Sequence, residues 1–141
     1  MKVLFLVHVE ESFREEFPDR MYVNRLLRAL RVYDRVICLV SHIMDYEPIP
    51  ELTQSYRSPE CWQWGWGYEE NVFHEDEEKN WVIPAYGHEY TWVPLELRDA
   101  NAWKNCEISV GGGCIDECLR DFIDVLEYVG IDHRVVDGYC Y

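Results

Sequence analysis

The chain has 141 residues, a length that usually builds one domain around one hydrophobic core. Its 27 acidic side chains outnumber 13 basic ones, and the resulting net charge of −14 would repel the phosphate backbone of a nucleic acid. Aromatic residues make up 15% of the chain and supply ample apolar area for a core, so we expect an ordered domain with no nucleic-acid partner.

The apolar runs of the chain are all short. The first, Val3–Val9, lacks the long hydrophobic region and small-residue cleavage site of a signal peptide. No stretch approaches the roughly 20 apolar residues that cross a membrane. Cys38 and Cys106 lie inside strand-like runs and no Cys-x-x-Cys pair occurs, so we expect reduced thiols. These features predict a cytoplasmic protein with no membrane contact, no metal and no cofactor.

The first third of the chain predicts a strand, a helix and a second strand. Val3–Val9 is a continuous apolar run with β-branched residues, which is typical of a strand covered on both faces. From Asp19 to Tyr33, apolar residues recur at helical spacing and arginines occupy the opposite side. Arg35–Val40 is the next buried strand, and one helix between the two strands suits a parallel crossover.

The middle of the chain is less regular. Cys61–Glu70 predicts a glycine-interrupted aromatic loop with little regular structure. Trp81–Pro84 is a candidate short strand, and a short helix is expected after Pro94, ending near Trp103.

The last third has the clearest pattern. Cys106–Val110 predicts a strand, Gly111–Gly113 a turn, and the apolar stripe from Ile115 to Val129 a helix. Gly130 predicts the end of that helix, and His133–Val136 a last strand.

Together these elements predict the fold class. We expect a three-layer α/β/α sandwich with a mainly parallel, Rossmann-like sheet of about five strands. The first strand should be central, with the Cys106–Val110 strand beside it and parallel to it, because both are continuous apolar runs.

The turn before the last helix could support chemistry. Three glycines between a strand and a helix expose backbone N–H groups at the positive end of the helix dipole, which suits an anion or an oxyanion; the alternative is a tight turn with close packing. Cys118 falls in the first helical turn, where the pKa of a nucleophilic thiol is lowered, and Cys114 competes for this role. An inert, packed cysteine is the alternative for both.

His8 follows the first strand, and ligands of open parallel sheets gather beyond the carboxyl ends of the strands. If the two apolar strands are neighbours, His8 lies near the glycine turn. Histidine is a suitable base for a cysteine, and Glu10 and Glu11 are candidate carboxylate partners; a histidine without a role is the alternative.

Three segments resemble the isochorismatase-like cysteine hydrolases. Val3–Phe13 (VLFLVHVEESF) is similar to the opening strand of that family, and Gly112–Leu119 (GGCIDECL) to its turn before the nucleophile. The segment Phe122–Cys140 is similar to the helix, glycine and last strand that follow. The resemblance implies that Cys118 is the nucleophile. The family's catalytic aspartate falls on His8, and its lysine has no counterpart after the Trp81–Pro84 strand.

The sequence therefore predicts a single isochorismatase-like domain over residues 1–141 that acts as a divergent cysteine hydrolase on a small-molecule amide or related bond. Cys118 would attack, His8 would take its proton, and the backbone N–H groups of Gly113, Cys114 and Ile115 would hold the oxyanion.

The alternative is a non-catalytic relative, a pseudoenzyme, that uses the aromatic segment 61–68 to bind a protein partner or a flat ligand. Its contact residues would be Trp62, Trp64, Trp66 and Tyr68, since Trp and Tyr are common interface anchors. Relatives that hydrolyse nicotinamide use a metal after the second strand; His42 and Asp45 lie there with a different spacing, and we predict no metal. The sequence leaves the oligomeric state open, a homo-oligomer included.

Overall fold

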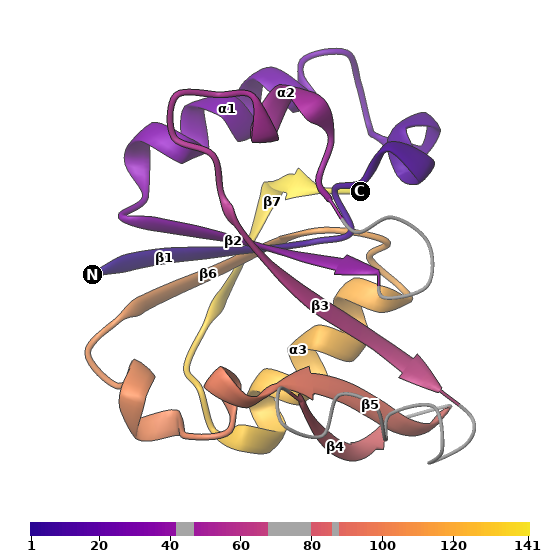
Figure 1. Cartoon of the computed structure of the whole chain (residues 1–141), viewed down its shortest axis with the longest axis vertical. Helices are drawn as coiled ribbons and strands as arrows, with labels where there is room; N and C mark the ends of the chain where they lie inside the picture. The colour runs from indigo at the N-terminus through magenta and orange to yellow at the C-terminus, as the bar shows by residue number, and fades with distance from the viewer. Residues whose placement is uncertain (42–46, 68–79, 86–87) are drawn as a thin grey trace.

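The computed structural model describes the backbone of residues 1–41, 47–67, 80–85 and 88–141, and the side chains of these ranges outside 65–93 (Figure 1). The strands are β1 (Lys2–Val7), β2 (Arg35–Ser41), β3 (Glu60–Gly67), β4 (Asn80–Ala85), β5 (His88–Pro94), β6 (Glu107–Gly112) and β7 (Arg134–Cys140). The α-helices are α1 (Tyr22–Val32), α2 (Pro50–Thr53) and α3 (Cys118–Val129), and short 3₁₀ helices are η1 (Glu11–Glu16), η3 (Leu95–Leu97) and η4 (Ala100–Trp103).

The strands form a sheet with the order β4-β5-β3-β2-β1-β6-β7. Within the described residues, β3, β2, β1, β6 and β7 are parallel to one another, while β5 is antiparallel to both β3 and β4 and extends the sheet beyond β3. β1 is central and pairs with β6 from Lys2↔Glu107 to Val7↔Gly112. The predicted α/β fold, and the predicted parallel pairing of these two strands, are confirmed.

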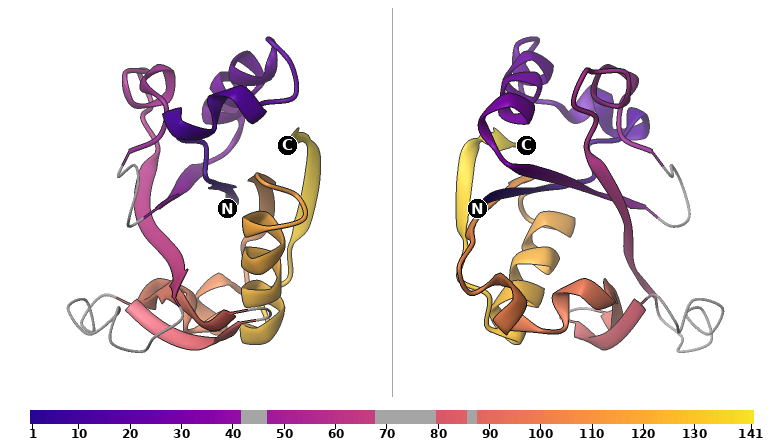
Figure 2. Two further views of the ribbon diagram at one scale, coloured as in Figure 1. Left: turned by 90° about the vertical axis from the view of Figure 1, so that its right-hand side faces the viewer. Right: turned by 60° about the vertical axis from the view of Figure 1, so that its left-hand side comes forward.

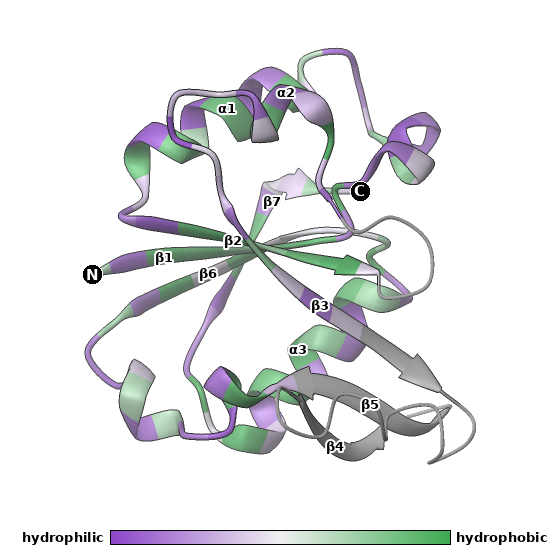
Figure 3. Cartoon of the chain, viewed as in Figure 1, coloured by the Kyte–Doolittle hydropathy of each residue, from purple (hydrophilic) through white to green (hydrophobic). Residues whose placement is uncertain are grey.

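Helices cover both faces of the sheet. α1 and α2 lie on one face and α3 on the other (Figure 2). Along β1, Val3, Phe5 and Val7 belong to the core on the α3 face, whereas Leu4 and Leu6 belong to the core on the α1 face. All five are fully buried, and β1 and β2 are the apolar centre of the molecule in Figure 3. Burying one such side chain stabilises the fold by roughly 1.5–3 kcal/mol.

β3 corrects the expectation of an irregular aromatic loop. Its first residues pair with β2, from Ile37↔Glu60 to Ser41↔Trp64. The side chains alternate, with Trp62 and Trp64 turned inward and Cys61 and Gln63 exposed, which is the period-two pattern of a strand. The hydrogen bonds to β2 and this packing outweigh the turn preference of the glycines.

The tryptophans of this segment build an aromatic core on the α3 face. The ring centroids of Phe5 and Phe122 are 5.4 Å apart, and Phe5 also packs against Trp62 at 5.9 Å and Trp103 at 5.6 Å. Trp64 is fully buried and packs against Phe122 at 5.8 Å. The expected helix after Pro94 is instead formed by η3 and η4, and η4 supplies Trp103 to this core.

The other predicted elements are present with shifted ends. α1 begins at Tyr22, after a turn in which Asp19 accepts a hydrogen bond from the Met21 N–H at 2.8 Å. α3 begins at Cys118 and ends at Val129, and the φ of 81° at the following Gly130 is the left-handed conformation expected of a helix-terminating glycine. None of the helices in the described ranges combines the length and hydrophobicity that crossing a bilayer requires.

Gly112 offers a test of the β1–β6 pairing. Its φ is +95°, and a Cβ atom there would lie 2.1 Å from the backbone oxygen of Val7. Gly112→Ala is expected to lower the free energy of unfolding by at least about 2 kcal/mol, because backbone strain and a backbone clash combine. Urea unfolding followed by circular dichroism measures this change.

Gly138→Ala is the matched control, since a Cβ atom at Gly138 meets nothing within 4 Å. This variant should stay within about 0.5 kcal/mol of the wild type. Equal stability of the two variants would contradict the close approach of Gly112 to β1.

Candidate functional site

The site begins at His8, the residue that follows β1. Its φ of 51° lies in the left-handed region, which residues other than glycine adopt at a cost of order 1 kcal/mol. Its N–H donates to the Leu39 oxygen at 2.9 Å, and its carbonyl accepts a hydrogen bond from the Tyr141 hydroxyl. The backbone of His8 is therefore held from β2 on one side and from the end of β7 on the other.

The imidazole of His8 forms a buried pair with Glu10. His8 Nδ1 lies 2.9 Å from Glu10 Oε2, and the two side chains are 4% and 0% exposed. The second carboxylate oxygen of Glu10 accepts a hydrogen bond from the Ser41 N–H at the end of β2. An ionised carboxylate only accepts hydrogen bonds, so the pair places the proton of a neutral imidazole on Nδ1 and leaves Nε2 as the basic nitrogen.

Aromatic contacts connect His8 to α3. The imidazole lies between Phe13 and Trp64, with ring centroids 5.3 and 5.5 Å away. Trp64 in turn packs against Phe122, four residues after Cys118 on α3. The expected contact residue Trp64 therefore lies in the core beside His8, where a protein partner does not reach it.

Cys118 is the first residue of α3 and is 7% exposed. Burial raises the pKa of its thiol well above the ordinary value, and nearby carboxylates, that of Glu10 among them, raise it further. The sequence predicted the opposite direction from the helix N-terminus, but desolvation of a buried thiolate outweighs the helix dipole here. Cys118 is therefore a protonated thiol at neutral pH, and the carboxylate of Glu10 is among the charges that act on it.

The glycine turn packs closely against its neighbours. The Gly113 N–H donates to the Val7 oxygen at 2.9 Å, and the Ile115 N–H donates to the Tyr141 oxygen at 2.8 Å. A Cβ atom on Gly113 would lie 2.4 Å from the Tyr141 ring. Three N–H groups were expected to hold an oxyanion, and those of Gly113 and Ile115 thus donate to acceptors in the protein. The Cys114 N–H is the remaining group of the three.

Tyr141 is the site residue that sequence reasoning missed. Besides its bonds to His8 and Ile115, its ring packs against Phe17 and Tyr22 with centroids 5.2 and 5.9 Å away. Burial raises the pKa of its phenol. The one signal available in the sequence was that a last parallel strand ends at the same edge of the sheet as β1, which directs the residue after it toward His8.

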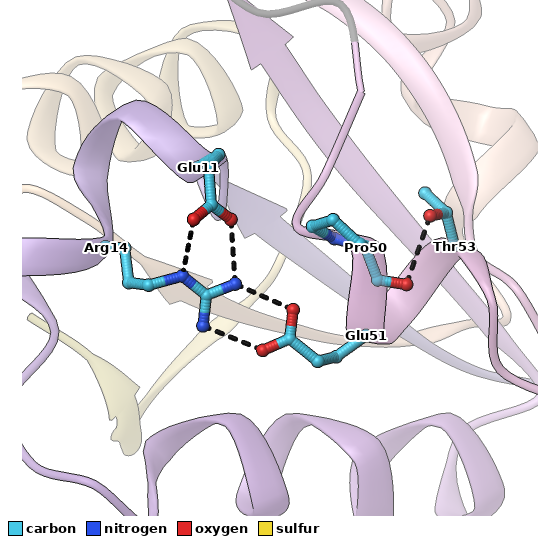
Figure 4. A network of polar contacts seen from close by, with 5 residues as sticks. All are labelled: Glu11, Arg14, Pro50, Glu51 and Thr53. Atoms are coloured by element: carbon cyan, nitrogen blue, oxygen red, sulfur yellow. Dashed lines mark hydrogen bonds and ion pairs between the residues drawn. The ribbon is translucent and has the colours of Figure 1, made fainter.

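An ion-pair network holds the segment after Glu10 in place (Figure 4). Arg14 of η1 donates to both carboxylate oxygens of Glu51 on α2, at 2.7 Å each, and to both oxygens of Glu11. The hydrogen bonds from Arg14 hold the pKa of Glu51 below its ordinary value of 4.5. The stabilisation of the fold by this ion pair is present above pH 4.5 and is lost as the pH falls through the lowered pKa of Glu51. Because both side chains are partly exposed to solvent, the stabilisation is modest.

The remaining predicted residues lie apart from this centre or outside the described residues. Trp62 is half-buried, with the Arg35 guanidinium 6.0 Å from its ring centroid. The side chains of Trp66 and Tyr68, and both metal-ligand candidates, His42 and Asp45, lie outside the described residues. The described histidine, cysteine and acidic side chains form no cluster that could hold a metal ion.

Comparisons with protein-family models, with curated proteins and with solved structures found no match to this chain. The structure shows the α/β fold, and the isochorismatase-like resemblance depends on the sequence motifs alone.

The tautomer of His8 tests the buried pair. In Glu10→Gln, the side-chain oxygen is needed by the Ser41 N–H, so the amide group faces His8 Nδ1 as a donor and should move the imidazole proton to Nε2. Long-range ¹⁵N–¹H NMR should detect the Nδ1–H tautomer in the wild type and the Nε2–H tautomer in the variant. The free energy of unfolding should fall by about 1–3 kcal/mol.

Glu15→Gln, at an exposed position of η1, is the control and should change neither the tautomer nor the stability. Detection of the Nε2–H tautomer in the wild type would contradict the pairing of His8 with Glu10.

Proposed function

We propose that this chain is a divergent cysteine hydrolase of the isochorismatase-like type, acting on a small-molecule amide or a related bond. The observation that supports it most is the buried contact of 2.9 Å between His8 Nδ1 and Glu10 Oε2, at the edge of the sheet where α3 begins with Cys118. A thiol, a histidine and a carboxylate that orients the histidine form a recurrent arrangement of nucleophilic catalysis.

The roles follow from the protonation states. Cys118 rests as a thiol, so its proton must leave when the sulfur attacks the carbonyl carbon, and Nε2 of His8 would take it. The imidazolium, stabilised by Glu10, would return the proton to the leaving amine as the C–N bond breaks. Water would then hydrolyse the thioester, with His8 as base, and restore the thiol. The Cys114 N–H would contribute to the oxyanion site.

Alkylation by iodoacetamide tests the base. Cys118 should react faster than Cys38, which is fully buried. Burial raises the pKa of the Cys38 thiol as well. His8→Ala should slow the Cys118 reaction at neutral pH by at least about tenfold, since general-base assistance is typically worth more than that. Rates measured across pH and resolved by peptide mass mapping give the comparison.

His133→Ala is the control, because this histidine lies beyond the end of α3, with Nδ1 3.0 Å from the Ile131 oxygen. It should leave the Cys118 rate unchanged. If His8→Ala remains folded and the Cys118 rate is indifferent to it, the hydrolase proposal fails.

The alternative proposal is a non-catalytic binding module of the same type. It is favoured by the raised pKa of Cys118 and by the acceptors that the Gly113 and Ile115 N–H groups already have. A protein partner or flat ligand would then contact the aromatic segment at Trp62, which is half-buried. For either function we propose a cytoplasmic location, supported by the free thiols of all six cysteines.

A further inference from the structure

A groove of about 590 Å³ lies beside α1, and neither His8 nor Cys118 is among the residues that line it. It is formed between α1 and the residues that follow α2. Its walls include Leu27, Arg28, Leu30, Arg31, Tyr56 and Arg57. Binding sites for small molecules commonly have volumes of about 300–1,000 Å³, so the groove is large enough for one.

The charge of this groove is opposite to that of the whole chain. Arg28 and Arg31 are three residues apart on α1 and therefore lie on the same side of the helix, and Arg57 faces them from the other wall. Three arginines thus line one groove of a protein with a net charge of −14.

Three other arginines of the structure have carboxylate partners, which the groove arginines lack among the described residues. Arg14, Arg25 and Arg35 each form an ion pair with a carboxylate, at 2.7 to 3.0 Å. Among the described residues, no carboxylate forms an ion pair with Arg28 or Arg31, and Arg57 contacts the backbone oxygen of Asp34 at 3.4 Å. Neighbouring like charges repel one another, and an anion in the groove would remove that repulsion.

The remaining walls suit a flat ring. Tyr56 is fully exposed at the groove, with a relative accessibility of 103%, so its ring is available for stacking. Leu27 and Leu30 supply apolar surface beside it. Arginine is the side chain best suited to phosphate, because its planar guanidinium donates two parallel hydrogen bonds.

We propose that this groove binds a small phosphorylated compound with a flat ring, of the mononucleotide class. The phosphate would be held by Arg28, Arg31 and Arg57, and the ring would stack on Tyr56. A nucleic acid is the less favourable ligand, because the net charge of −14 on the chain would repel its phosphate backbone.

Titration calorimetry and NMR chemical-shift mapping at low salt test this proposal with AMP, GMP, CMP and UMP, inorganic phosphate and adenosine as probes. We expect saturable binding of at least one mononucleotide, weaker binding of phosphate and none of adenosine. Replacing two guanidinium groups in Arg28→Gln/Arg31→Gln should weaken mononucleotide binding by at least about tenfold. Tyr56→Ala should weaken mononucleotide binding and leave phosphate binding unchanged.

Arg20→Gln is the matched control, because it removes one exposed positive charge outside the groove and should leave binding unchanged. All the substituted side chains are exposed, so the variants should fold, and their circular dichroism spectra check this. Absence of binding by all four mononucleotides, or affinity unaffected by the double substitution, would overturn the proposal. Tighter binding of a single-stranded oligonucleotide than of any mononucleotide would overturn it in favour of a nucleic-acid surface.

Discussion

The site depends on the close approach of two backbones, Val7 at the end of β1 and Gly112 at the end of β6. The absence of a side chain at Gly112 allows this approach. It brings the Gly113 N–H to the Val7 oxygen, and it sets where the turn into α3 begins. Tyr141 then joins the two sides by bonding to His8 and Ile115. The position of His8 relative to the start of α3 is therefore a consequence of backbone packing.

The same close packing determines the chemistry of the site. A buried thiol stays protonated, so in the proposed hydrolase Cys118 would need a base in contact with it during the reaction, rather than a thiolate stabilised by the helix dipole. In that proposal the His8–Glu10 pair would be the base, and its 2.9 Å contact fixes the orientation of the imidazole at the same edge of the sheet. The arginine groove on α1 contrasts with this arrangement, because its charged groups are exposed and its proposed ligand would come from solvent.

Local sequence patterns predicted the central part of the fold. Long apolar runs, helical spacing and the helix-terminating Gly130 indicated the elements that the structure contains. β3 and β5 were missed because their residues combine glycine or polar side chains with aromatic ones, and long-range pairing decides such segments. His8 and Glu10 were identified as candidates, but their contact and the role of Tyr141 depend on tertiary structure. The sign of the Cys118 pKa shift depends on burial, which residue spacing alone does not determine.

The hydrogen bond from the Gly113 N–H to the Val7 oxygen can be tested most directly by NMR. The quantity to measure is the scalar coupling across this bond, between the Gly113 nitrogen and the Val7 carbonyl carbon, in deuterated, ¹⁵N,¹³C-labelled protein. The distance of 2.9 Å between the donor nitrogen and acceptor oxygen predicts a detectable correlation and slow exchange of the Gly113 amide hydrogen with solvent. No correlation, together with rapid exchange of that hydrogen, would contradict the account, because the glycine turn would then not be bonded to β1.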